Sequence, residues 1–153
     1  MFFIALILIL AWAFFGLKIE SYTSKETSVP SYGPFSLRIG ESTCVKGQRG
    51  VFATVAFTKG DVVEKCPCVI VSSELSLGRF DDYTFEAGEG FQGLAFGYGC
   101  MYNHSKNPNV EFEYDSETNT KTYTALRDIQ PGEELFSSYG SGWWKGRKGL
   151  ATC

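Results

Sequence analysis

The chain has 153 residues, a formal net charge of −3 and an apolar content of 44%. This length suits one folded domain and is too short for two ordinary ones. The small acidic charge and the lack of a basic stripe argue against direct nucleic-acid binding, whereas a basic peptide partner is compatible with them. The irregular spacing of the cysteines favours buried thiols over a zinc site or a disulfide framework. They are Cys44, Cys66, Cys68, Cys100 and Cys153.

Residues 1–17 form a hydrophobic segment that contains no acidic or basic side chain. As a helix, such a segment would be slightly short for a full membrane crossing. One interpretation is a retained signal anchor that associates the protein with a membrane. The other is a signal for secretion or plastid targeting, cleaved near Ala13 in the small-x-small sequence Ala11-Trp12-Ala13. Residues 18–34 are rich in Ser, Thr and Pro and predict a linker.

From residue 35 onward, short segments of β-branched and aromatic residues alternate with Gly-containing turns. This spacing predicts a mainly β domain. Strands are expected near residues 37–39, 51–53, 55–57, 62–64, 69–71, 110–114 and 121–125, with a last strand ending at Tyr139-Gly140. Pro67 is expected to interrupt the chain before residues 69–71. Residues 75–85 show only a weak helical period.

The usual catalytic motifs are absent from the sequence. It contains neither a nucleophile elbow nor a phosphate-binding loop. Glu133 and Glu134 could form an acid/base pair, but their position after Pro131-Gly132 favours a solvated turn. The only histidine, His104, lies in the segment Asn103-His104-Ser105, which follows a Gly-spaced apolar run.

Several short motifs occur in a fixed order along the chain. They are Gly50-Val51-Phe52-Ala53, Lys59-Gly60-Asp61, Asp82-Tyr83-x-Phe85, Asn103-His104-Ser105-x-x-Pro108-Asn109, and Gly132-Glu133-Glu134-Leu135 followed by Tyr139-Gly140. Together the motifs resemble the SET-domain protein lysine methyltransferases, especially the compact viral and algal type that lacks flanking zinc modules. The resemblance places a SET domain at residues 35–144 and leaves residues 145–153 as a C-terminal tail.

The resemblance implies a fold of several small curved sheets with few short helices. It also implies a C-terminal pseudoknot that brings Asn103 and Tyr139 together. The family's methyl donor is S-adenosylmethionine, and the matching positions imply a catalytic role for Tyr139 and a lysine-channel position for Tyr83. The implied cofactor contacts are Gly50, Val51, Phe52, Asn103, His104, Trp143 and Trp144. No metal is implied.

The residues themselves are compatible with this chemistry. Methyl transfer to lysine needs a neutral amine and correct placement, and a narrow aromatic channel disfavours the charged amine by desolvation. The implied function is therefore transfer to a lysine of a protein or peptide, such as a histone tail. Two departures, Gln48 in the Gly turn and Ser137 before Tyr139, leave open a non-catalytic peptide-binding or cofactor-binding module. A membrane-tethered scaffold is a third interpretation. The number of methyl groups and the oligomeric state are not predicted.

Overall fold

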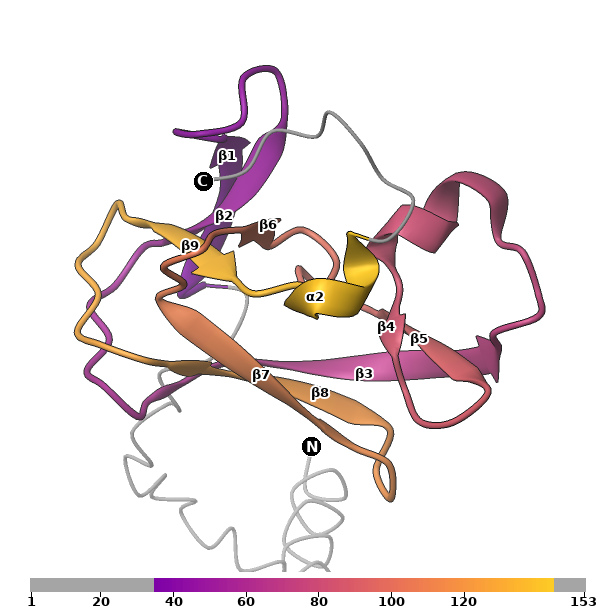
Figure 1. The fold of residues 1–153 in the computed structure, drawn as a ribbon. Coiled ribbons are helices and arrows are strands. Elements are labelled where there is room, and N and C mark those ends of the chain that lie inside the picture. The colour runs from indigo at the N-terminus through magenta and orange to yellow at the C-terminus, as the bar shows by residue number, and fades with distance from the viewer. Residues whose placement is uncertain (1–34, 145–153) are drawn as a thin grey trace, which may run out of the picture.

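The computed structural model describes residues 35–144, which form two small sheets and two short helices (Figure 1). The predictions for the hydrophobic segment, the linker and the C-terminal tail lie outside these residues. Within the described part of the chain, no helix combines the length and the apolar character that a membrane crossing needs.

The smaller sheet has four strands in the order β1-β2-β9-β6. They are β1 (Leu37–Glu41), β2 (Arg49–Ala53), β9 (Glu134–Ser137) and β6 (Asn103–His104). The pairs β1·β2 and β2·β9 are antiparallel, whereas β6 runs parallel to β9. Strand β2 is buried from its second residue onward because it has a neighbour on each side.

The larger sheet has five strands in the order β4-β5-β3-β8-β7. They are β4 (Phe85–Glu86), β5 (Phe91–Ala95), β3 (Val62–Ser72), β8 (Thr120–Ala125) and β7 (Val110–Asp115). Strands β7 and β8 form the predicted hairpin, paired in register along both strands.

Pro67 does not interrupt the chain, so that expectation was wrong. It lies inside the 11-residue strand β3, at the point where β3 changes partners. Residues up to Pro67 pair with β8, and residues from Cys68 onward pair with β5. The carbonyl of Pro67 accepts from Phe96 N (2.9 Å), just beyond the end of β5. Because the N–H and C=O of a strand residue point to the same side, the missing donor falls where this pairing ends.

Two other boundaries differ from the sequence-based expectation. Residues 55–57 are not a strand, since only Phe57 pairs, in an isolated bridge with Ile129. The last strand ends at Ser137, and the short helix α2 (Gly140–Trp143) begins at Gly140, which has a positive φ of 74°. The weak period at 75–85 corresponds to the 3₁₀ helix η1 (Gly78–Tyr83).

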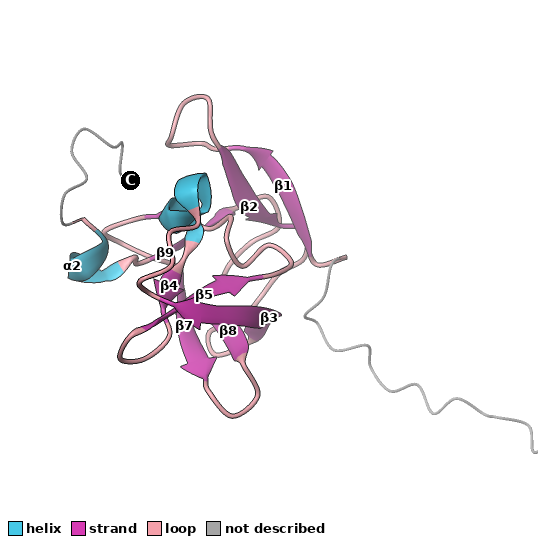
Figure 2. Ribbon diagram, turned by 90° about the vertical axis from the view of Figure 1, so that its right-hand side faces the viewer, coloured by secondary structure: helices cyan, strands magenta, loops and turns pink. Residues whose placement is uncertain are grey.

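One hydrophobic core serves both sheets. Its fully buried side chains include Val51 of β2, Leu135 of β9, Val63 of β3 and Tyr123 of β8. Figure 2 shows β1 and β2 at one end of the domain, the five-stranded sheet at the other, and β9 between them. The structure therefore confirms the mainly β fold of small sheets with few short helices.

Candidate active site

The segment 103–109 surrounds the last strand. Asn103 and His104 pair with Phe136 and Ser137 in parallel, and Ser105 N donates to Ser137 O (3.1 Å). At the other end of the segment, Asn109 N donates to Phe136 O (3.1 Å). The chain after β9 is thereby held beside Asn103 and His104, which is the proximity that the expected pseudoknot requires.

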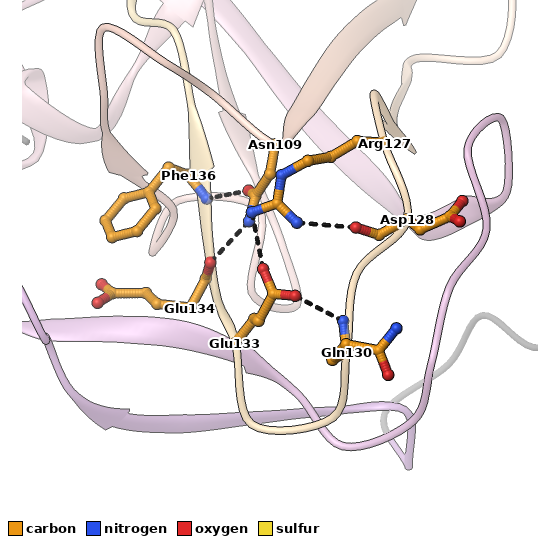
Figure 3. A network of polar contacts seen from close by, with 7 residues as sticks. All are labelled: Asn109, Arg127, Asp128, Gln130, Glu133, Glu134 and Phe136. Atoms are coloured by element: carbon orange, nitrogen blue, oxygen red, sulfur yellow. Dashed lines mark hydrogen bonds and ion pairs between the residues drawn. The ribbon is translucent and has the colours of Figure 1, made fainter.

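Asn109 secures this arrangement with its side chain (Figure 3). It is 2% exposed; its Nδ2 donates to Glu134 O (2.8 Å), and its Oδ1 accepts from Phe136 N (2.7 Å). The amide thus satisfies two backbone groups of β9 that would otherwise be buried without partners. The neighbouring ion pair between Arg127 and Glu133 (2.7 Å) is partly exposed.

Tyr139 follows β9 and is held at both its backbone and its hydroxyl. Tyr139 N donates to His104 Nδ1 (3.2 Å), and Tyr139 Oη donates to the carbonyl of Tyr102 (2.7 Å). Burial, together with the nearby Tyr83 phenol, raises the pKa of Tyr139 to about 12. The phenol is therefore protonated at neutral pH. Its hydrogen bond to the Tyr102 carbonyl fixes the orientation of the hydroxyl group.

His104 is a neutral acceptor at this position. Burial, and secondarily the charge of Lys106, lowers the pKa of its imidazole. The unprotonated Nδ1 is the form that can accept from Tyr139 N. Rings surround it, with Trp144 at 4.8 Å and Tyr139 at 5.4 Å between ring centroids. Trp143 packs on both Tyr139 (4.7 Å) and Trp144 (4.8 Å), so His104, Tyr139, Trp143 and Trp144 form one aromatic cluster.

Asn103 and Gly50 meet at a buried carboxylate. Asn103 Nδ2 donates to Glu134 Oε1 (2.9 Å) and to Arg49 O (3.0 Å). Glu134 Oε2 accepts from Thr43 N (2.7 Å) and Thr43 Oγ1 (2.6 Å). A Cβ at Gly50 would overlap this carboxylate and lie 3.0 Å from Asn103 Nδ2. The expectation of a solvated turn holds for Glu133 but was wrong for Glu134, which is 5% exposed.

The side chains of Val51 and Phe52 are buried in the interior of the domain. Val51 is fully buried between Ile39 and Leu135, and Phe52 is 4% exposed with the guanidinium of Arg38 over its ring (4.5 Å). Only their backbone is left for contact with a ligand, and their role at a cofactor stays a prediction.

An aromatic cavity of about 780 Å³ lies between η1, the five-stranded sheet and α2. Its lining includes Tyr83, Tyr102, Phe112, Lys121, Tyr123, Tyr139 and Trp143. The structure therefore brings the two predicted tyrosines and Trp143 together at one cavity. The other predicted residues do not line it. His104 is joined to it through Tyr139, and Asn103 through the adjoining residue Tyr102.

Several residues with defined places near the site were not identified from the sequence. Glu64 is buried and accepts from Tyr102 Oη (2.8 Å) and Tyr98 N (2.8 Å). Tyr102 in turn stacks on Tyr123 with 3.9 Å between ring centroids. Burial first, and then the charge of Glu64, raises the pKa of Tyr102 well above its ordinary value. Glu64 thereby positions the residue whose carbonyl receives the Tyr139 hydroxyl.

One signal could have revealed part of this set. In the sequence Thr-Lys-Thr-Tyr-Thr-Ala of β8, the alternate residues Lys121, Tyr123 and Ala125 are buried. A strict period of two therefore turns Lys121 inward together with Tyr123. No such local signal exists for Glu64 or Glu134, whose partners come from 31 to 91 residues away along the chain.

Comparison with known proteins identifies the family. The family model of the SET domain matches residues 48–140, more than half of the chain. The chain belongs to the SET-domain family. A Schizosaccharomyces pombe relative, named histone-lysine N-methyltransferase, H3 lysine-37 specific, is 39% identical over 101 residues. The match covers 63% of this chain and 69% of that protein.

Solved structures agree with this SET-domain assignment. A crystal structure of a Plasmodium falciparum protein assigned as a histone methyltransferase superposes with a TM-score of 0.61 and 34% identity. The match covers 71% of this chain and 96% of that one. A chain of an active polycomb repressive complex 2 gives a TM-score of 0.60 at 24% identity, over 69% of this chain and 15% of that chain. At that identity the second match concerns the fold alone.

Proposed function

We propose that this SET-domain protein is an S-adenosylmethionine-dependent protein-lysine N-methyltransferase. The observation that carries the proposal is the aromatic cavity in which the Tyr139 hydroxyl is fixed by the Tyr102 carbonyl. The naming of the Schizosaccharomyces pombe relative as a histone-lysine N-methyltransferase supports it.

The residues beside Tyr139 fit a purine-bearing cofactor. His104, Trp143 and Trp144 are partly exposed and offer flat ring faces close to the backbone of β6 and β9. Such faces stack well on a heteroaromatic base. We assign these rings, with Asn103 and the Gly50–Phe52 backbone, to holding S-adenosylmethionine. When bound, this cofactor supplies an electrophilic methyl group on a sulfonium.

The cavity prepares the acceptor amine. A lysine side chain entering between Tyr83 and Tyr139 leaves water for an aromatic environment, which disfavours its ammonium form. The fixed hydroxyl of Tyr139 can then orient the neutral amine, because the phenol oxygen still has acceptor capacity after donating to Tyr102. Placement of this kind supplies most of what an in-line displacement needs.

The rim of the cavity suits a basic peptide. Asp81, Asp82 and Glu86 are among its lining residues, together with the exposed ring of Phe91. Carboxylates around an aromatic opening favour a lysine-containing segment with further positive charges, such as a histone tail. The histone-lysine methyltransferase name of the Schizosaccharomyces pombe relative supports this class of substrate.

A test of the proposal uses the full chain, labelled S-adenosylmethionine and a mixture of core histones. Wild type is expected to label a histone lysine, and Tyr139→Phe to lower the rate about 10²-fold or more. Tyr114→Phe is the matched control, since it also loses a hydroxyl with a hydrogen bond (to Asn119, 2.7 Å) but does not line the cavity. Undiminished transfer by Tyr139→Phe would remove Tyr139 from the mechanism.

Calorimetry with S-adenosylmethionine separates the enzyme from a non-catalytic module. Heat of cofactor binding without transfer to any histone would identify a binding module instead. Absence of both binding and transfer would refute the cofactor assignment.

We also propose that residues 1–17 associate the protein with a membrane, on the basis of their uninterrupted apolar sequence. A tagged full-length protein is expected in the membrane fraction, and deletion of residues 1–17 should release it from that fraction. A tagged deletion variant that stays in that fraction would refute the assignment.

A further inference from the structure

A buried lysine of the protein itself lines the proposed acceptor cavity. Lys121 on β8 is 6% exposed and shares the cavity with Tyr83 and Tyr139. In register across the sheet it lies between Cys66 of β3 and Tyr114 of β7. Its side chain therefore extends from the same face of the sheet as these two neighbours, toward the aromatic side chains that line the cavity.

Aromatic rings surround the ammonium group of Lys121. Its Nζ lies 3.8 Å from the ring centroid of Phe112, 4.5 Å from that of Phe85 and 5.1 Å from that of Tyr123. Ring faces attract a desolvated cation electrostatically. Lys121 forms no ion pair with another of the described residues 35–144. The charge is therefore stabilised without being neutralised.

Among the titratable groups of residues 35–144 that line this cavity, Lys121 is the one that carries a positive charge. Cys66 and Cys68 of β3 and Cys100 of the loop between β5 and β6 are thiols whose pKa is raised by burial, so they are neutral at pH 7. The carboxylate of Glu64 is bound by Tyr98 and Tyr102. Other titratable residues on the lining are Asp81, Asp82, Tyr83, Glu86, Tyr102, Tyr123 and Tyr139.

Burial lowers the pKa of Lys121 to about 8. This value is still above neutrality, so about nine tenths of the side chain is charged at pH 7. A second amine that enters the same cavity then faces a like charge. Within about 4 to 6 Å, a like charge shifts a titration by about 1 to 3 pH units. A lysine beside another cationic group is a known means of making a reactive neutral amine.

We propose that the Lys121 ammonium is a fixed charge that disfavours the ammonium form of the entering lysine and so selects its neutral amine. The acceptor releases its proton to solvent before the methyl transfer, and Lys121 keeps its own. This role rests on the proposed methyltransferase function. It makes Lys121 a positioning residue for the protonation state of the substrate.

The pH dependence of the reaction tests this role. The full chain is assayed with labelled S-adenosylmethionine and core histones from pH 6.5 to pH 10. Lys121→Met keeps an unbranched apolar side chain but removes the charge. At saturating histone, its half-maximal kcat is expected about one pH unit higher than that of wild type, which is about a tenfold loss in kcat at pH 7. The two rates should converge near pH 10, where Lys121 itself is neutral.

Two variants serve as controls. Lys121→Arg keeps the charge and should retain the wild-type profile. Lys59→Met removes the charge of an exposed lysine on a turn, away from the cavity, and should also leave the profile unchanged. An unchanged profile for Lys121→Met would overturn the proposal. So would an equal loss at every pH, which indicates a structural role. Methylation of Lys121 itself, seen by mass spectrometry, would also overturn it by making this residue an acceptor.

A measurement without turnover separates failure of this inference from failure of the proposed function. In the full chain labelled with ¹³C-lysine, the ε-methylene signal absent from Lys121→Met belongs to Lys121. This signal is expected to titrate near pH 8. A midpoint below about 6.5 would make Lys121 neutral at pH 7, and a midpoint at the ordinary value near 10.4 would indicate solvation. Either result overturns the proposal, whether or not any histone is methylated.

Discussion

Substitution of Gly50 by Ala should destabilise the domain through one buried carboxylate. The added Cβ would overlap the carboxylate of Glu134, lying 2.8 Å from Glu134 Cδ and 3.0 Å from Asn103 Nδ2. Glu134 cannot move aside without weakening its hydrogen bonds from Thr43 and Asn103. Overpacking alone costs about 1 to 3 kcal/mol, and one weakened bond to a charged group adds about 1.5 to 3 kcal/mol. We expect a total loss of about 3 kcal/mol in the free energy of unfolding.

Urea unfolding of the full chain, followed by circular dichroism, measures this loss. Gly142→Ala is the control, because a Cβ there meets nothing within 4 Å. The decisive comparison is a double-mutant cycle with Glu134→Ala. Removal of the carboxylate should reduce the cost of Gly50→Ala to less than about 1 kcal/mol, a coupling of about 2 kcal/mol. Additive losses, or a Gly50→Ala variant as stable as Gly142→Ala, would refute the proposed overlap.

Two further stability predictions concern the polar contacts around β9. Asn109→Ala leaves two backbone groups of β9 without partners and should cost about 2 to 4 kcal/mol, whereas the exposed Asn107→Ala should stay within about 0.5 kcal/mol in the same urea assay. Arg127→Ala should cost less than about 1 kcal/mol, because its ion pair with Glu133 is partly exposed. The hydrogen bond from Arg127 lowers the pKa of Glu133 below the ordinary 4.5, so this difference is present above pH 4.5 and disappears as the pH falls through the lowered pKa. A difference that grows toward acidic pH, or an Asn107→Ala loss that matches Asn109→Ala, would contradict these assignments.

Local alternation predicted the strands that pair with a sequence neighbour. The β7–β8 hairpin shows this best, since its two strands and its turn lie within 16 residues and their apolar residues alternate. The expected strand at residues 55–57 failed because β propensity does not provide a partner, and only Phe57 finds one, in Ile129. Pro67 was misjudged for a related reason, because its tolerance depends on where two other strands begin and end.

In the candidate site, too, residues with a signal in the sequence were predictable and residues that depend on distant partners were not. Tyr139, Tyr83 and the aromatic residues near the C-terminus could be selected by an ordered set of motifs. The buried state of Glu134 could not, because it depends on Thr43, 91 residues away. Lysine is almost always solvent-exposed, so residue type alone does not predict the burial of Lys121 among three rings.

The parallel pairing of β6 with β9 has a consequence for biosynthesis. Strand β6 is at the edge of its sheet and pairs only with β9, and Asn103 is 31 residues from its partner Glu134. At about 5 to 20 residues per second, a ribosome needs roughly 2 to 6 s to make that interval. The five-stranded sheet, whose last strand ends at Ala125, can be complete while Asn103 and His104 still lack a partner strand. A chain that ends between Ala125 and Glu134 would contain every strand of the five-stranded sheet but not the strand with which Asn103 and His104 pair. Methyl transfer, where measured, would therefore report that synthesis has proceeded through Tyr139.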